Sequence, residues 1–242
     1  MKKLILLLLF FSLNGLLQTI AAQSQFAGWL ASFNTIKLNN KHSLHLDVQL
    51  RTTDEWKKVQ TFLIRPGINF HLSKKTILSV GYAYINNYRT ISNVSDYLPE
   101  HRLWEQFIIP HQIKKVSVLH RFRLEERFLP RTIVQSTELE TDGFTLAGRF
   151  RYFIRSVIPL KKQETFTKGA FVAIQNEIFL NIFGLSKVNN AFFDQNRFYL
   201  AAGFRINPKA DLEIGYMNQY VKGRSSMNST THALQIAGYL RL

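Results

Sequence analysis

Arginine recurs at intervals of two or four residues in two stretches of the chain, and this spacing is the strongest chemical signal in the sequence. The first stretch, 121–127, reads Arg-Phe-Arg-Leu-Glu-Glu-Arg, and the second, 149–155, reads Arg-Phe-Arg-Tyr-Phe-Ile-Arg. A guanidinium group is a planar fork that binds a carboxylate or a phosphate at two points. Two kinds of chemistry are therefore open: the arginines interlock with glutamates inside the protein, or they bind anions from solution.

The elements that carry these arginines are expected to be two long β-strands. A period of two places the arginines on one face of each strand, over residues 116–128 and 144–158, and aromatic and aliphatic side chains on the other face. Both stretches are longer than the roughly 5–6 residues usual for a strand. In a transmembrane barrel the apolar faces meet lipid and the polar faces meet an enclosed lumen. We therefore predict an all-β fold, an antiparallel transmembrane β-barrel.

Eight further segments alternate in the same way and bring the number of clear strands to ten. They are 44–52, 60–70, 77–86, 103–110, 170–181, 197–206, 211–220 and 234–240. A segment at 26–38 would make eleven, but single-chain bacterial barrels usually have an even number of strands. We therefore expect about 10–12 strands, ten or twelve being favoured, with 26–38 outside the wall or one strand unrecognised.

The connections between these strands alternate in length. Short ones are expected at 39–41, 73–75, 111–115 and 207–210, and long ones at 88–100, 129–142, 181–195 and 221–230. This predicts short periplasmic turns at one rim and longer extracellular loops at the other.

Eleven arginines lie on polar strand faces and are candidates to line the lumen and an anion path. They are Arg51, Arg65, Arg121, Arg123, Arg127, Arg149, Arg151, Arg155, Arg197, Arg205 and Arg241. The acids expected to partner them are Asp47, Glu125, Glu177 and Glu213. Eleven arginines against four acids leaves some free to bind anions, as charged rings do in selective pores. The alternative is a narrow barrel plugged by interlocked side chains, and the sequence leaves both open.

Composition and the N-terminus indicate where the protein works. The formal net charge of +15 favours anionic partners. Lys2 and Lys3, an apolar run at 4–13 and small residues up to Ala22 are typical of a secretory signal peptide at 1–22, with an uncleaved anchor as the alternative. We predict a mature barrel at 23–242 in the bacterial outer membrane, in contact with the lipid bilayer and lipopolysaccharide, with a small anionic solute as a further partner. A nucleic-acid role is not expected.

Catalysis is a weaker reading of the same sequence. The chain has no cysteine, which removes thiolate chemistry and disulfides. His120, Ser156 and Asn176 lie on lipid faces and contain the residue types of a lipid hydrolase, but no hydrolase motif surrounds them. We expect no enzyme activity, no cofactor and no metal site. A soluble, basic periplasmic β-protein is the alternative architecture.

The chain resembles the domain of unknown function 2490 family of predicted bacterial outer-membrane β-barrel proteins. The resemblance is carried by Arg102-Leu103-Trp104-Glu105-Gln106, the run from His120 to Phe128, Asn176-Glu177-Ile178-Phe179-Leu180-Asn181, Phe193-Asp194-Gln195-Asn196-Arg197 and Gly215-Tyr216-Met217-Asn218-Gln219. It implies an outer-membrane barrel and no catalytic residues. The Arg-x-Arg strands are also similar in pattern to those of small channels for acidic oligosaccharides. The expected function is a narrow passive channel that favours anions, with a plugged structural or binding barrel as the alternative.

Overall fold

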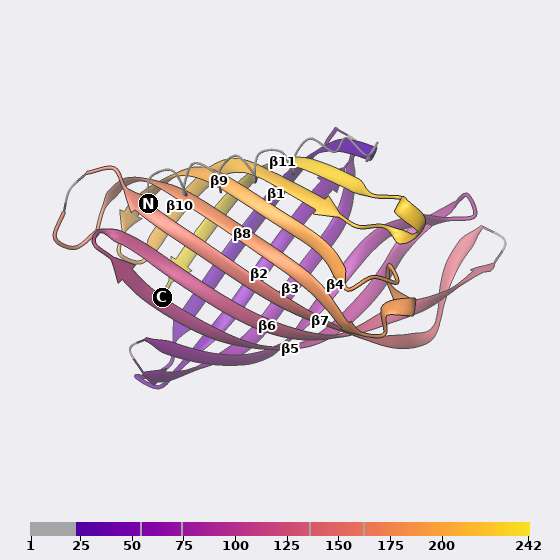
Figure 1. Ribbon diagram of the computed structural model, residues 1–242, viewed down its shortest axis with the longest axis horizontal. Helices are drawn as coiled ribbons and strands as arrows, with labels where there is room; N and C mark the ends of the chain where they lie inside the picture. Colours follow the sequence, from indigo (N-terminus) through magenta and orange to yellow (C-terminus); the bar gives the residue numbers. More distant parts are fainter. Residues whose placement is uncertain (1–22, 54, 74, 136, 162) are drawn as a thin grey trace, which may run out of the picture.

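Eleven strands join edge to edge into one closed barrel in the computed structural model, which describes residues 23–242 apart from 54, 74, 136 and 162 (Figure 1). The strands are β1 (Gln23–Lys37), β2 (His42–Thr53), β3 (Lys58–Ser73), β4 (Thr76–Ile91), β5 (Val94–Ile113), β6 (Val116–Gln135), β7 (Glu138–Pro159), β8 (Gly169–Phe183), β9 (Phe193–Asn207), β10 (Ala210–Val221) and β11 (Ser229–Arg241). Two 3₁₀ turns, η1 (Leu185–Lys187) and η2 (Arg224–Ser226), lie in connections. Among the described residues, no helix is long and apolar enough to cross a membrane. The predicted all-β barrel is confirmed.

The expectation of an even number of strands is wrong. Segment 26–38 belongs to the wall as β1, which pairs antiparallel with β2 and parallel with β11. The parallel seam runs from Gln23 opposite Ser229 to Thr35 opposite Arg241. Every other neighbouring pair is antiparallel, so an odd number of strands can close only through one parallel pair.

Two of the predicted long loops are also wrong. Residues 88–100 and the described part of 129–142 continue the strands into hairpins that project from one end of the barrel, the first turning at 92–93 (Figure 1). The β5–β6 pairing starts at His101 opposite Phe128, so beyond that level each hairpin pairs mainly with itself. The connections 184–192 and 222–228 carry η1 and η2 at the same end. We call this end the hairpin rim.

The opposite end, which we call the turn rim, carries the short connections. Tight turns join β1 to β2, β3 to β4, β5 to β6 and β9 to β10, as predicted. The exception is the nine-residue connection 160–168 between β7 and β8. The alternating pattern of the strands did not single out this segment.

Strand β10 illustrates how the two faces of the wall differ. Its inward side chains Asp211 and Glu213 are 8% and 1% exposed, whereas its outward side chains Leu212 and Ile214 are 53% and 51% exposed. A period of two turns alternate residues to opposite faces, so the barrel is apolar outside and charged inside. Two outward carboxylates, Glu105 and Glu126, interrupt the apolar surface.

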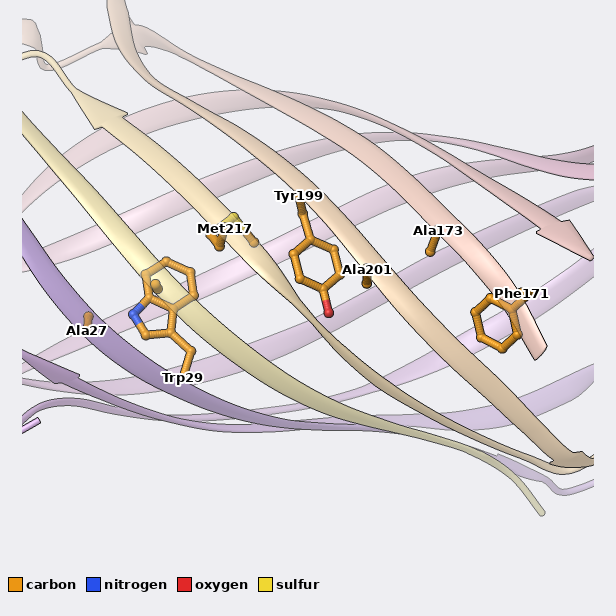
Figure 2. Packing of buried hydrophobic residues seen from close by; sticks show 8 residues of the cluster. Ala27, Trp29, Phe171, Ala173, Tyr199, Ala201 and Met217 are labelled. Carbon is orange, nitrogen blue, oxygen red and sulfur yellow. The ribbon is translucent and has the colours of Figure 1, made fainter. Parts of the chain in front are cut away.

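Small and aromatic side chains fill the lumen next to β1 and β8–β11. Buried alanines on β1, β8, β9 and β11 leave room there for Trp29, Tyr199 and Phe171 (Figure 2). On the far side Trp104 of β5 lies over Gly67 and Gly81, where a Cβ atom on either glycine would collide with the indole ring. The lumen is therefore packed on both sides, and charged side chains occupy the space between.

Candidate functional site

A cavity of about 650 Å³ opens inside the barrel at the hairpin rim. Eight arginines and two lysines line it, against the two carboxylates of Glu100 and Asp194. The two loops above it are tied together, because the Arg224 guanidinium donates to the Val188 carbonyl at 3.0 Å and the Asn189 amide donates to the Lys222 carbonyl at 2.9 Å. These bonds position Lys187 and Lys222 at its edge. We call this cavity the vestibule.

A layer of ion pairs, centred on Glu125 and Glu177, lies below the vestibule. Glu125 accepts from Arg149 at 2.7 Å and from Arg151 at 2.5 Å, and it is 2% exposed. Glu177 accepts from Arg121 and Arg151 at 2.7 Å each. Arg151 thus bridges both carboxylates. We call Glu125, Glu177 and these three arginines the central layer.

Further ion pairs lie on either side of the central layer. Towards the hairpin rim, Glu100 accepts from Arg102 and Arg127 at 2.6 and 2.7 Å. Other pairs are Arg65 with Asp47 at 2.7 Å, Arg149 with Asp194 at 2.7 Å, Arg155 with Glu213, Arg205 with Asp211 at 2.7 Å, and Arg241 with Asp211 at 2.9 Å. Arg205 and Arg241 lie at the turn rim, and the Arg241 side chain is 39% exposed.

Four charged residues of these networks are absent from our sequence-based set. Glu100 and Asp194 belong to strands that extend into stretches we expected to be loops, and Arg102 precedes the predicted start of its strand by one residue. Asp211 lay on a polar face but was not counted as a partner. Extending the alternation backwards from Trp104 would have found Arg102 and Glu100, since inward residues follow at every second position. With these acids included, most of the arginines have a partner.

Two of the eleven predicted arginines differ from the rest. Within the part of the chain that the structure describes, nine have a carboxylate oxygen within 4.0 Å, and Arg51 and Arg197 have none. Both line the vestibule. Each also has a buried Nε that lacks a hydrogen-bond partner among the described residues. Of the eleven, they are the two whose charge no carboxylate of the described residues compensates by direct contact.

Aromatic rings hold these two guanidinium groups in place. The Arg51 Cζ lies 4.3 Å from the centre of the Trp29 ring, and the Arg197 Cζ lies 5.4 Å from the same ring and 4.8 Å from that of Phe179. Arg51 also donates to the Gln49 amide oxygen at 2.6 Å. Stacking on a ring uses the face of a guanidinium and leaves donors in its plane for an anion.

The outward-facing set considered for catalysis is not joined by hydrogen bonds among the described residues. His120 Nδ1 lies 2.8 Å from the Tyr152 hydroxyl, and its ring stacks on His111. The Asn176 amide is bonded to that of Asn196 at 3.1–3.2 Å. Both groups are therefore engaged with residues other than Ser156, and this geometry gives no support to a hydrolase. Among the described residues, no three His, Asp or Glu side chains gather in a way that would hold a metal ion.

The fold and these contacts define a small closed β-barrel with a charged, densely paired lumen and a basic vestibule at one end. The chain belongs to the family described as "Protein of unknown function (DUF2490)", whose model matches residues 26–230. An uncharacterized protein of Methylorubrum extorquens is 23% identical over 195 residues, covering 81% of this chain and 78% of that protein. A solved NanC porin structure shares 10% identity at a TM-score of 0.49, over 84% of this chain and 93% of that one. A likeness this distant supports no conclusion about this chain.

Proposed function

We propose that this protein is an outer-membrane barrel that binds small anionic solutes in its vestibule. The observation that carries the proposal is the pair of uncompensated guanidinium groups, Arg51 and Arg197, at the floor of a cavity with ten basic and two acidic side chains. Carboxylate and phosphate groups are the natural ligands of such donors. The exposed apolar faces of the strands support a location in lipid.

The central layer supports binding over free diffusion as the resting activity. Arg123 and Glu125, next to each other in this part of the lumen, are 0% and 2% exposed, so water does not reach them. Moving an ion past such a layer requires breaking buried pairs, which is costly when one partner is left alone. On this proposal, the resting barrel is open to solutes at the hairpin rim and is closed below the vestibule by the central layer.

A narrow anion channel is the second candidate, and one observation favours it. Inward arginines continue below the central layer, through Arg155 to Arg205 at the turn rim. A chain of cations from one rim to the other would guide anions if the ion pairs rearranged. Planar-bilayer conductance of the folded protein under a salt gradient tests it: steps with an anion-selective reversal potential support the channel, and a silent bilayer leaves the binding barrel.

Binding itself is tested with citrate and sulfate on the detergent-folded protein. We expect citrate to bind and to raise the unfolding midpoint, since a ligand of the native state stabilises it. The variant Arg51→Gln/Arg197→Gln should bind at least about tenfold more weakly, as expected for the loss of about 1.4 kcal/mol or more. Arg131→Gln is the matched control, because Arg131 is exposed and bonds the Asp142 carbonyl on a projecting hairpin. Equal affinity of the double variant and the control would refute the site.

The membrane location is tested separately. A folded barrel should migrate differently on a denaturing gel before and after boiling, and should fractionate with the outer membrane. A protein that stays soluble without detergent would contradict the location and leave the anion site to be judged by its own assay.

A further inference from the structure

Phe166, in the described part of the connection 160–168, lies against the lumen at the turn rim. Phe166 packs against the buried cluster of β1 and β8–β11, and its ring meets that of Phe171 edge-on at 5.8 Å. Phe171 is 1% exposed and stands over Gly203, where a Cβ atom would collide with the ring. Phe166 therefore lies beneath the last closed layer of the lumen, at the mouth.

One arginine fastens this segment to the wall. Arg205 of β9 donates from Nη1 to the Phe166 carbonyl at 2.8 Å, and its Cζ lies 4.5 Å from the centre of the Phe166 ring. The same guanidinium makes a two-point pair with Asp211, through Nε at 2.7 Å and Nη2 at 2.9 Å. Arg205 would keep its counter-ion if the Phe166 contact broke. Release of the segment would therefore leave no buried charge unpaired.

The segment has a defined base and internal bonds. Gly169, where it meets β8, has a φ of +127°, a conformation that residues with a side chain rarely adopt. The Leu160 amide donates to the Ala170 carbonyl at 3.0 Å and closes the base. Across the segment, the Gln163 side chain donates to the Lys168 carbonyl at 2.8 Å. Residues 163–168 are thus built to move together about Gly169.

We propose that residues 163–168, which we call the gate strap, close the lumen at the turn rim. The Phe166 ring blocks the opening, and the contacts of Arg205 with Phe166 hold the gate strap in its closed position. An anion that reaches Arg205 competes with the neutral Phe166 carbonyl for Nη1, and charge-assisted bonds are the stronger ones. Anion arrival thereby releases the strap. The vestibule lies at the other rim, so the gate strap is independent of anion binding at Arg51 and Arg197.

The absence of native cysteines gives a direct test. Ala173 is 0% exposed and belongs to the same cluster as Phe171, so the thiol of Ala173→Cys reports access to the lumen above the strap. With a water-soluble thiol reagent on the folded protein, Arg205→Gln and Phe166→Ala should each raise the labelling rate at least about tenfold. Added sulfate should accelerate labelling in the Ala173→Cys parent and have no effect once Arg205 is replaced.

Two matched controls separate loss of the Arg205 contacts with Phe166 from general loosening of the rim. Arg241→Gln removes the other partner of Asp211 without touching the strap, and Thr165→Ala changes an exposed residue next to Phe166. Neither should alter the labelling rate. Labelling that is unchanged in both Arg205→Gln and Phe166→Ala, or raised equally by Arg241→Gln, would overturn the gate. Should Arg205→Gln fail to fold, as judged by gel migration, Phe166→Ala decides alone. A parent indifferent to sulfate would overturn release by anions.

Discussion

The central layer and the vestibule floor are built from the same side chain and differ in what surrounds it. In the central layer Arg151 touches Glu125 and Glu177 at 2.5 and 2.7 Å. At the vestibule floor Arg51 and Arg197 rest on aromatic rings, with no carboxylate within 4.0 Å in the described chain. We therefore assign the paired guanidinium groups to the scaffold, and we propose that the unpaired ones next to the cavity bind anions.

The difference teaches that an arginine count alone does not define an anion path. A buried ion pair contributes little net stability while both partners are present, and removing one partner leaves the other charge buried and uncompensated, which is strongly destabilising. Loss of a charge at the vestibule should instead change ligand binding more than stability. Substitutions in the two regions, and added salt, should therefore have different effects on stability and on binding.

Glu125→Gln should be the most damaging single change in the central layer. It leaves Arg149 and Arg151 buried with one carboxylate fewer, and we expect a loss of about 3–5 kcal/mol in the free energy of unfolding. Urea unfolding in detergent, followed by gel migration, measures it. The neighbouring Glu126→Gln, on the outward face, is the control and should shift stability by less than about 0.5 kcal/mol. Similar effects of the two changes would mean that the ion pairs do not hold the lumen together.

Gly81→Ala should destabilise the packing beside the central layer. The added methyl would collide with the indole of Trp104 and the backbone of Pro66, and overpacking of this kind costs about 1–3 kcal/mol. Gly238→Ala serves as the comparison, because nothing lies within 4 Å of the Cβ it would add. The same unfolding measurement checks both. A tolerant Gly81 would show that the Trp104 side of the lumen is loosely packed.

Arg197→Glu should weaken anion binding at the vestibule floor without lowering the stability of the barrel. The change replaces a cation beside the Trp29 ring, which Arg51 also contacts, by a carboxylate that repels anions, so we expect citrate affinity to fall at least about tenfold. Stability should be unchanged or rise by up to about 1 kcal/mol. Calorimetric titration and urea unfolding measure the two effects. Strong citrate binding by this variant would place the anion site elsewhere in the cavity.

Salt should affect the vestibule and the central layer differently, and the wild-type protein alone is enough to show it. The Debye length falls from about 10 Å at 0.1 M to about 3 Å at 1 M salt, and buried pairs are screened much less than accessible charges. Raising the sodium chloride concentration over this range should therefore weaken citrate binding severalfold and move the unfolding midpoint little. A midpoint that falls steeply with salt would mean that water and ions reach the central layer.

The alternation of residues was enough to predict most of the wall. A one-residue step reverses the direction of a side chain, so Leu212 and Glu213 could be assigned to opposite faces without a structure. The same rule failed at strand ends. Residues 88–100 and 129–142 were expected to be loops, whereas cross-strand pairs such as Tyr88 with Tyr97 extend the hairpins. Glu100 was missed for this reason.

Whether the barrel has an even or an odd number of strands could not be derived from the local sequence pattern. Whether segment 26–38 joins the wall depends on its pairing with Leu44–Arg51 on one side and with a strand more than 200 residues away on the other. The alternating sequence of β11 is compatible with an antiparallel or a parallel neighbour. Closure around the whole ring decides between them.

By itself, the sequence determined the fold class, the two faces of most strands and the surplus of positive charge, because each depends on residue type and on a period of two. Only the tertiary structure decided which arginines are paired. Glu125 of β6 meets Arg149 and Arg151 of β7, and Glu177 of β8 meets Arg121 of β6 across an intervening strand. Such contacts depend on register, on the curvature of a closed wall and on the reach of long side chains across the lumen. The same geometry leaves Arg51 and Arg197 facing the vestibule. These two of the eleven predicted lumen arginines therefore form the candidate site.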